Sequence, residues 1–234
     1  LLLGTLLISG FALAQEQSTE VKQDTLKNWS IQGQNTIMLN QAAFSNWIGG
    51  ANNIGWIAGV NYNMTYEKGN DLWENIVILG YGQNNTEGLG TRKTQDIINL
   101  STNYGKKISK SWYVSGGASL LTQFAPGYAD GNNPAAAKIS NFMAPGYVNV
   151  GAGFTYRPSD NFTMTLRPAN ARWTFVLDKD LQYAGNYGLK NNGDSSLFQF
   201  GFLGTAIYNV KLMENITLVN STSEFSKYLD HTDR

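Results

Sequence analysis

Short polar turns of this chain have an aromatic residue on each side, and this arrangement narrows the choice of folds more than any other feature. Tyr66 and Trp73 enclose one such turn, and Tyr104 and Trp112 enclose another. Tyrosine and tryptophan rings combine an apolar body with a polar edge, so transmembrane β-barrels place them at headgroup depth on successive hairpins. We therefore predict an aromatic girdle at one membrane interface, formed by Tyr66, Trp73, Tyr104, Trp112, Tyr156, Phe162 and Tyr208.

Between the turns, large apolar residues alternate with glycine, asparagine and threonine. From Asn53 to Tyr66 this alternation has a single interruption, at Ile57. A soluble β-sandwich would show the same period of two, but its strands are typically about 5 or 6 residues long. The 53–66 segment would rise about 35 Å at roughly 3.3 Å per residue and a tilt near 40°. Its length favours a membrane-spanning strand.

The connections between these segments alternate in length. The shorter ones are residues 67–72, 105–111, 157–161 and 211–215, and the longer ones are 40–53, 85–93, 124–146 and 177–197. Short periplasmic turns and long outer loops produce this asymmetry in an antiparallel up-and-down barrel. About nine strands are expected, with a bulge or bend where Pro168 interrupts the segment 162–176. Because single-chain bacterial barrels have even strand numbers, nine strands would not complete a barrel, and we expect a C-terminally truncated chain here.

The beginning of the chain predicts export. Residues 1–14 form an apolar run that closes on Ala12-Leu13-Ala14, as in a cleaved signal peptide, and the run is too short for a transmembrane anchor. The absence of an initiator methionine and a basic segment suggests a truncated start. We expect a short periplasmic segment at 15–28, a barrel domain at 29–234 and localisation in the bacterial outer membrane.

Composition excludes several classes of function. The chain has no cysteine, which rules out disulfides and thiol catalysis, and its 17 basic residues balance 17 acidic ones. This neutral balance argues against nucleic acid as a partner, because nonspecific binding depends on positive charge. A mean hydropathy of -0.28 fits strands that alternate apolar and polar residues. The expected partners are outer-membrane lipid and either a small solute or an envelope protein.

Several stretches resemble a known but uncharacterised envelope family. They are Trp29 with its strand, 44–47 (FSNW), 92–94 (RKT), 122–128 (TQFAPGY) and 140–147 (SNFMAPGY). The sequence is similar to the domain of unknown function 3078 (DUF3078) over most of the mature chain, and the two APGY stretches are the most specific element. This resemblance implies a Gram-negative outer-membrane barrel without an established activity. It also implies further strands after a segment like 216–230, which would agree with a total of about twelve strands.

The two APGY stretches form a candidate outer-rim motif. Proline and glycine can bend the chain sharply at a strand end while the aromatic residues pack against the bend. One interpretation is a rim that recognises a ligand or partner, and the other, which we favour, is loop architecture. The motif residues are Phe124, Pro126, Gly127, Tyr128, Phe142, Pro145, Gly146 and Tyr147.

Charged residues on the strands form a second candidate site. Glu74, Asp96, Arg167 and Arg172 could project into the lumen. Unpaired charge in a narrow interior is costly, so a mixed set is expected to pair and partly fill the barrel. In a wide, wet lumen the same groups would select solutes by charge. About twelve strands leave limited room, which favours the structural network.

Three hypotheses for function follow. A passive or solute-specific porin-like channel comes first, and a nonenzymatic scaffold or subunit of an envelope assembly comes second. A barrel lipid hydrolase or acyltransferase comes third, because the single histidine, His231, has only Ser226 nearby in the sequence. The segment 130–133 (DGNN) faintly resembles the start of a calcium-binding loop, but it lacks the later carboxylate and the full spacing that such a loop requires. We predict no enzyme activity, no catalytic or metal-binding residues and no cofactor.

Overall fold

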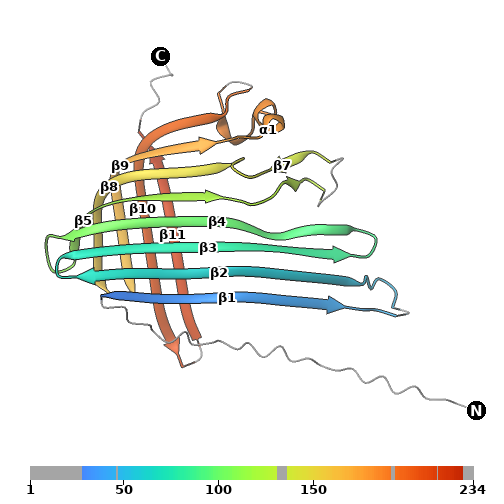
Figure 1. Ribbon diagram of the computed structural model, residues 1–234, viewed down its shortest axis with the longest axis horizontal. Helices are drawn as coiled ribbons and strands as arrows, with labels where there is room; N and C mark the ends of the chain where they lie inside the picture. The colour runs from blue at the N-terminus through green and yellow to red at the C-terminus, as the bar shows by residue number, and fades with distance from the viewer. Residues whose placement is uncertain (1–27, 46, 131–135, 191–192, 215, 229–234) are drawn as a thin grey trace, which may run out of the picture.

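The computed structural model describes residues 28–45, 47–130, 136–190, 193–214 and 216–228. Most of them lie in one nine-stranded antiparallel sheet that curls into a half-barrel (Figure 1). This confirms the predicted all-β, antiparallel up-and-down fold, and the curvature is consistent with an incomplete β-barrel. The predicted signal peptide at 1–14 lies outside the described residues, as does the segment 15–28 except for Asn28.

The strands follow one another around the sheet in chain order. They are β1 (Trp29–Ala42), β2 (Asn53–Lys68), β3 (Asp71–Thr86), β4 (Gly90–Lys107), β5 (Trp112–Thr122), β8 (Gly146–Ser159), β9 (Phe162–Phe175), β10 (Ser196–Met213) and β11 (Ile216–Lys227). Each strand pairs with the next, and β1 and β11 are the two edges of the described sheet. The β2–β3, β4–β5, β8–β9 and β10–β11 connections lie at one end of the strands, which we call the turn end. The β1–β2, β3–β4, β5–β8 and β9–β10 connections lie at the opposite, loop end.

Two small insertions lie at the loop end (Figure 1). The β5–β8 connection contains a hairpin of β6 (Gly127–Tyr128) and β7 (Lys138–Ser140). The β9–β10 connection contains helix α1 (Lys179–Tyr183) and the 3-10 turn η1 (Asn186–Gly188). Within the described ranges, no helix has the length and apolar composition needed to cross a membrane.

The alternation of the sequence separates the two faces of the sheet. The β2–β3 register pairs Tyr66 with Trp73 and Val60 with Leu79, and these residues lie on the convex face. Residues one position away, such as Thr65 and Glu74, line a hollow on the concave face. The outer face is therefore rich in apolar and aromatic residues, whereas asparagine, serine, threonine and glycine dominate the inner face.

The segment around Pro168 is a strand with a bulge, as predicted. Register shifts occur between Ala152 and Phe154 on the β8 side and between Gly201 and Leu203 on the β10 side. Proline has no N–H to donate, so a strand accommodates it where the ladder is already interrupted. The bulge keeps Arg167 and Arg172 on the same face although they are five residues apart.

The expectation of a long outer loop at 85–93 was wrong. β3 continues to Thr86 and β4 begins at Gly90, so only residues 87–89 connect them. Cross-strand bonds between polar side chains, such as Asn85 Nδ2 to Thr91 Oγ1 at 2.8 Å, extend the hairpin beyond the apolar part of the strands. Polar residues indicated a loop, but here they pair across a sheet.

The register also orients β11, which the sequence pattern left open. Tyr208 pairs with Asn220 and Gly204 pairs with Glu224, so these β11 residues lie on the convex face. Phe225 and Ser223 lie on the concave face, opposite Leu203 and Thr205. The outer surface of β11 is therefore more polar than that of the other strands.

Candidate functional site

The predicted girdle residues lie in one row at the turn end of the convex face. Trp29, an additional member, is 5.3 Å from Tyr66 and 5.5 Å from Trp73 between ring centroids. The row continues through contacts of Trp112 with Tyr156, Tyr156 with Phe162, and Phe162 with Tyr208, at 4.8, 6.4 and 6.3 Å. Tyr104 pairs with Trp73 in the β3–β4 register.

A second aromatic row lies near the loop end of the convex face. Tyr81 is 5.8 Å from Trp56 and 6.4 Å from Phe124, and Trp173 is 5.0 Å from Phe198. Trp56 and Tyr66 are ten residues apart on β2, which corresponds to a rise of about 25 Å at a strand tilt near 40°. This spacing equals the height of the apolar band that separates the two aromatic girdles of outer-membrane barrels.

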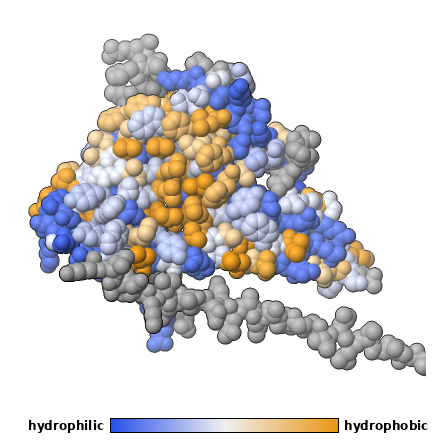
Figure 2. Space-filling view, viewed as in Figure 1, coloured by the Kyte–Doolittle hydropathy of each residue, from blue (hydrophilic) through white to orange (hydrophobic). Residues whose placement is uncertain are grey.

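Apolar side chains occupy the convex face between the two rows. Figure 2 shows them gathered in the middle of the face turned to the viewer, with hydrophilic residues towards both ends of the strands. Val114, Val150 and Phe154 keep 49, 47 and 44% of their surface exposed. Paired members of the band are Val60, Val77, Leu79, Ile98, Leu100, Ala118, Val150 and Ala152.

The concave face carries a hydrogen-bonded network centred on Asn103. Arg167 Nη2 donates to Asn103 Oδ1 at 3.0 Å, and Asn103 Nδ2 donates to Thr155 Oγ1 at 3.2 Å. Asn103 also hydrogen-bonds the carboxylate of Glu74. Asn103 thus links Glu74 to Arg167, and the two candidate lumen charges share a neutral partner.

Gly117 and Gly151 lie directly under the Arg167 side chain on the concave face, and we call these two residues the glycine floor. A Cβ atom added to Gly117 would lie 2.4 Å from Arg167 Nη2, and one added to Gly151 would lie 3.1 Å from its Cδ. The side chain therefore extends from β9 along the wall of the half-barrel, over β8 and β5, to Asn103 on β4. Arg167 is 7% exposed, and its Nε has no hydrogen-bond partner.

Arg157, a residue that the sequence analysis did not single out, carries the ion pairs of the inner face. Its guanidinium lies 2.8 Å from Asp160 and 3.6 Å from Glu67, close to the turn end. Electrostatic attraction also connects Arg157 with Glu74. Arg157 directly follows Tyr156 in the sequence, and only the strand register shows that it faces the hollow beside Glu74.

Arg172 lies on the concave face nearer the loop end, apart from the Asn103 network. Its guanidinium carbon is 4.8 Å from the ring centroid of Tyr147 and 5.0 Å from that of Phe225. Tyr147 is thus a rim-motif residue that lies on the concave face. This cluster could not be predicted from the sequence, because its members come from β8, β9 and β11.

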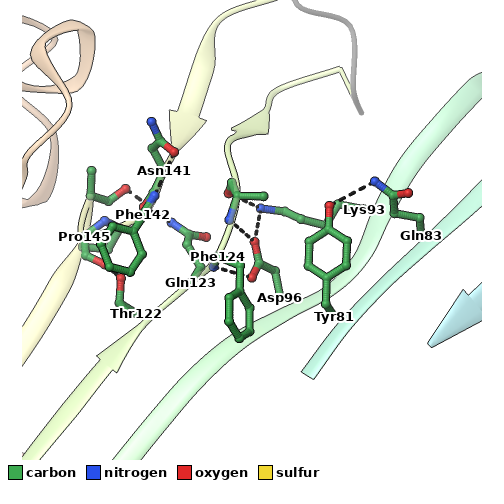
Figure 3. A network of polar contacts seen from close by, with 12 residues as sticks. Tyr81, Gln83, Lys93, Asp96, Thr122, Gln123, Phe124, Asn141, Phe142 and Pro145 are labelled. Carbon is green, nitrogen blue, oxygen red and sulfur yellow. Dashed lines mark hydrogen bonds and ion pairs between the residues drawn. The ribbon is translucent and has the colours of Figure 1, made fainter. Parts of the chain in front are cut away.

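Asp96 occupies a different place from the other three candidate charges. It pairs with Tyr81 and shares the convex face with Ile98, so it is not part of the inner network. Its carboxylate, 3% exposed, accepts hydrogen bonds from Lys93 Nζ at 2.7 Å and from the backbone N–H groups of Phe124 and Ala125 at 2.7 and 3.1 Å. Asp96 anchors the first APGY stretch to β4 (Figure 3).

The second APGY stretch is tied to the first through the end of β5 (Figure 3). Thr122 Oγ1 donates to the carbonyl of Pro145 at 3.0 Å and accepts from Met143 N at 2.9 Å. Gln123 Nε2 donates to the carbonyl oxygens of Asn141 and Ala144 at 3.0 and 3.3 Å. These bonds join both stretches into one rim, while the Phe142 side chain stays 54% exposed.

An ion cluster attaches this rim to helix α1. Lys138 Nζ lies 2.9 Å from Asp178 and 2.7 Å from Asp180, and Asn141 Nδ2 donates to Asp178 at 2.7 Å. Burial raises the pKa of Asp178, but the hydrogen bonds from Lys138, Asn141 and the Leu181 N–H outweigh it, so the pKa lies below its ordinary value. Asp178 also caps α1, by accepting from the N–H groups of Asp180 and Leu181.

Two further interpretations from the sequence, a catalytic histidine and a calcium loop, concern residues that are mostly not described. His231 lies outside the described residues, and so does most of the segment 130–133. In the part of the chain that is described, no group of three or more His, Cys, Asp or Glu residues could hold a metal ion.

Comparison with known proteins finds a family model that matches part of the chain. No curated protein and no solved structure is significantly similar to it. The family model described as a protein of unknown function (DUF3078) matches residues 39–128, from β1 to the first APGY stretch. The resemblance to DUF3078 that the sequence suggested is thus confirmed over residues 39–128.

Proposed function

We propose that this protein forms the wall of a bacterial outer-membrane β-barrel and that its lumen conducts small solutes. The observation that carries this proposal is the pair of aromatic rows on the convex face, with exposed apolar side chains between them. Rings at headgroup depth and apolar residues between them satisfy both environments of a bilayer. In water, a continuous apolar band of this kind would promote aggregation.

The opposite face supports a hydrated lumen. Asn63, Thr65, Ser101, Asn149 and Thr205 line the hollow, and their hydroxyl and amide groups can bond to water. Arg167 lies along the glycine floor instead of projecting across the hollow. Its position leaves space for solutes, which favours a channel over a barrel filled by its own side chains.

Planar-bilayer conductance of the complete protein, purified into detergent, tests this proposal. We expect a heat-modifiable barrel that gives reproducible conductance steps, absent from a heat-denatured control. Folded, heat-modifiable protein without steps would contradict the channel but leave the membrane barrel intact. Protein that stays soluble without detergent and shows no heat modifiability would contradict both.

The rim supports a second candidate function, a scaffold in an envelope assembly. Asp96, Thr122 and Gln123 hold its two stretches in a fixed arrangement, while Phe142 and Ile139 expose 54 and 49% of their surface. A preorganised surface with exposed apolar residues is suited to protein contacts. Cross-linking from Phe142 in the envelope would recover a specific protein if this rim is a docking surface, and none if it is not.

A further inference from the structure

We propose that the cavity around Arg172 is a binding site for small organic anions that carry a carboxylate or phosphate group. This inference deepens the proposed channel function, since it names the solute class that the lumen would favour. The cavity lies on the concave face near the loop end and has a volume of about 1110 Å³. Ligand sites for small molecules typically occupy about 300–1000 Å³, so the space suffices.

The described charges that this inference uses are both positive. Arg172 and Lys190 are among the residues that line the cavity, and its lining contains no acidic residue among those described. Two cationic side chains on one cavity attract anions and raise their local concentration.

Arg172 is held in a way that suits anion recognition. Tyr147 and Phe225 both lie within cation–π distance of its guanidinium, which fixes its position. Among the residues that the structure describes, no carboxylate forms an ion pair with Arg172. The planar fork of an arginine matches the two oxygens of a carboxylate or phosphate, so an oxyanion in the cavity can pair with the terminal nitrogens of Arg172.

Neighbouring side chains can hold the rest of such a ligand. Gln199 on β10 and Thr174 on β9 offer polar groups in the same cavity, and Leu197 adds apolar surface. A small number of polar groups beside apolar surface is typical of sites that orient an organic ligand. The cavity is therefore better suited to an organic anion than to a bare halide.

Isothermal titration calorimetry on the full chain, folded in detergent, tests this site without relying on conductance. The probes are benzoate, inorganic phosphate and the cation benzylamine, which resembles benzoate in shape. We expect benzoate or phosphate to bind and benzylamine to give no binding heat. The two anions separate carboxylate from phosphate recognition.

Two variants locate the binding. Arg172→Gln removes the positive charge within the cavity, and we expect it to weaken anion binding by roughly ten-fold or more, the effect of losing a charged hydrogen bond. Arg92→Gln is the matched control, because it removes one positive charge at the loop end where Arg92 pairs with Asp130. It should change the affinity by less than about two-fold, as expected for an exposed ion pair. Heat modifiability confirms that each variant is folded.

The outcomes separate this inference from the channel proposal. Anion binding that depends on Arg172 supports the site even if bilayers show no conductance. Conducting protein that binds neither anion, or binds benzylamine equally well, overturns the site and leaves the channel. Undiminished anion binding by folded Arg172→Gln also overturns it.

Discussion

Gly117 and Gly116 offer a sharp test of which face of β5 is tightly packed. A Cβ atom at Gly117 would lie 2.2 Å from the carbonyl oxygen of Thr102 and 2.4 Å from Arg167 Nη2. Real Cβ atoms are not found this close to a backbone oxygen, so Gly117→Ala must displace β4 or Arg167. At Gly116, on the convex face, the nearest atom would be the Gly151 carbonyl oxygen at 3.6 Å, an ordinary contact.

The expected effects have opposite signs. Overpacking costs typically about 1–3 kcal/mol, so Gly117→Ala should lower the free energy of unfolding by that amount. Gly116→Ala should leave this free energy unchanged or raise it by up to about 1 kcal/mol, because alanine is entropically less costly than glycine in a strand. The two substitutions add the same methyl group at adjacent positions, which makes each the control for the other.

Urea unfolding of both variants, refolded into lipid vesicles and followed by tryptophan fluorescence, measures the difference. A more stable Gly116→Ala and a less stable Gly117→Ala would support the glycine floor under Arg167. Equal effects, or a Gly117→Ala variant as stable as the wild type, would refute it.

Three further predictions concern residues outside this floor. Asp96→Asn should lower the free energy of unfolding by about 3 kcal/mol, because it leaves the cation of Lys93 without its buried partner; urea unfolding would contradict this if the loss stayed below about 1 kcal/mol. Because its pKa is lowered in the folded state, Asp178 should stabilise the protein above its ordinary pKa of 3.8 and lose this effect as the pH falls further. Asp178→Ala should therefore lower the melting temperature at pH 6 and have a smaller effect at pH 3, whereas equal losses at both values would count against the ion cluster. Glu224→Leu should raise the free energy of unfolding in vesicles by about 1–2 kcal/mol if the convex face of β11 contacts lipid, and a decrease would argue against that contact.

Strand alternation and turn positions were enough to predict the all-β fold and the bulge at Pro168, because period two and proline chemistry are local properties. Residues 85–93 were misread because polar residues can pair across a hairpin as well as form a loop. Asn85 and Thr91 do so here.

The inner network could not be read from the sequence for a different reason. Asn103 and Arg167 are 64 positions apart, and their contact depends on the register of four strands and on glycines that leave room for the side chain. A glycine in a strand pattern hints at a close approach, but it does not identify what approaches. The same holds for Arg172, whose ring partners come from two other strands.

Spin-label accessibility along β3 tests the membrane barrel most directly. The chain has no cysteine, so each position from Asn75 to Leu79 can be replaced singly and labelled. In vesicles, labels at Asn75, Val77 and Leu79 should be accessible to oxygen from the lipid, whereas labels at Ile76 and Ile78 should be accessible to a water-soluble nickel reagent. Accessibility that lacks this period of two, or that reverses it, would contradict a barrel whose convex face contacts lipid.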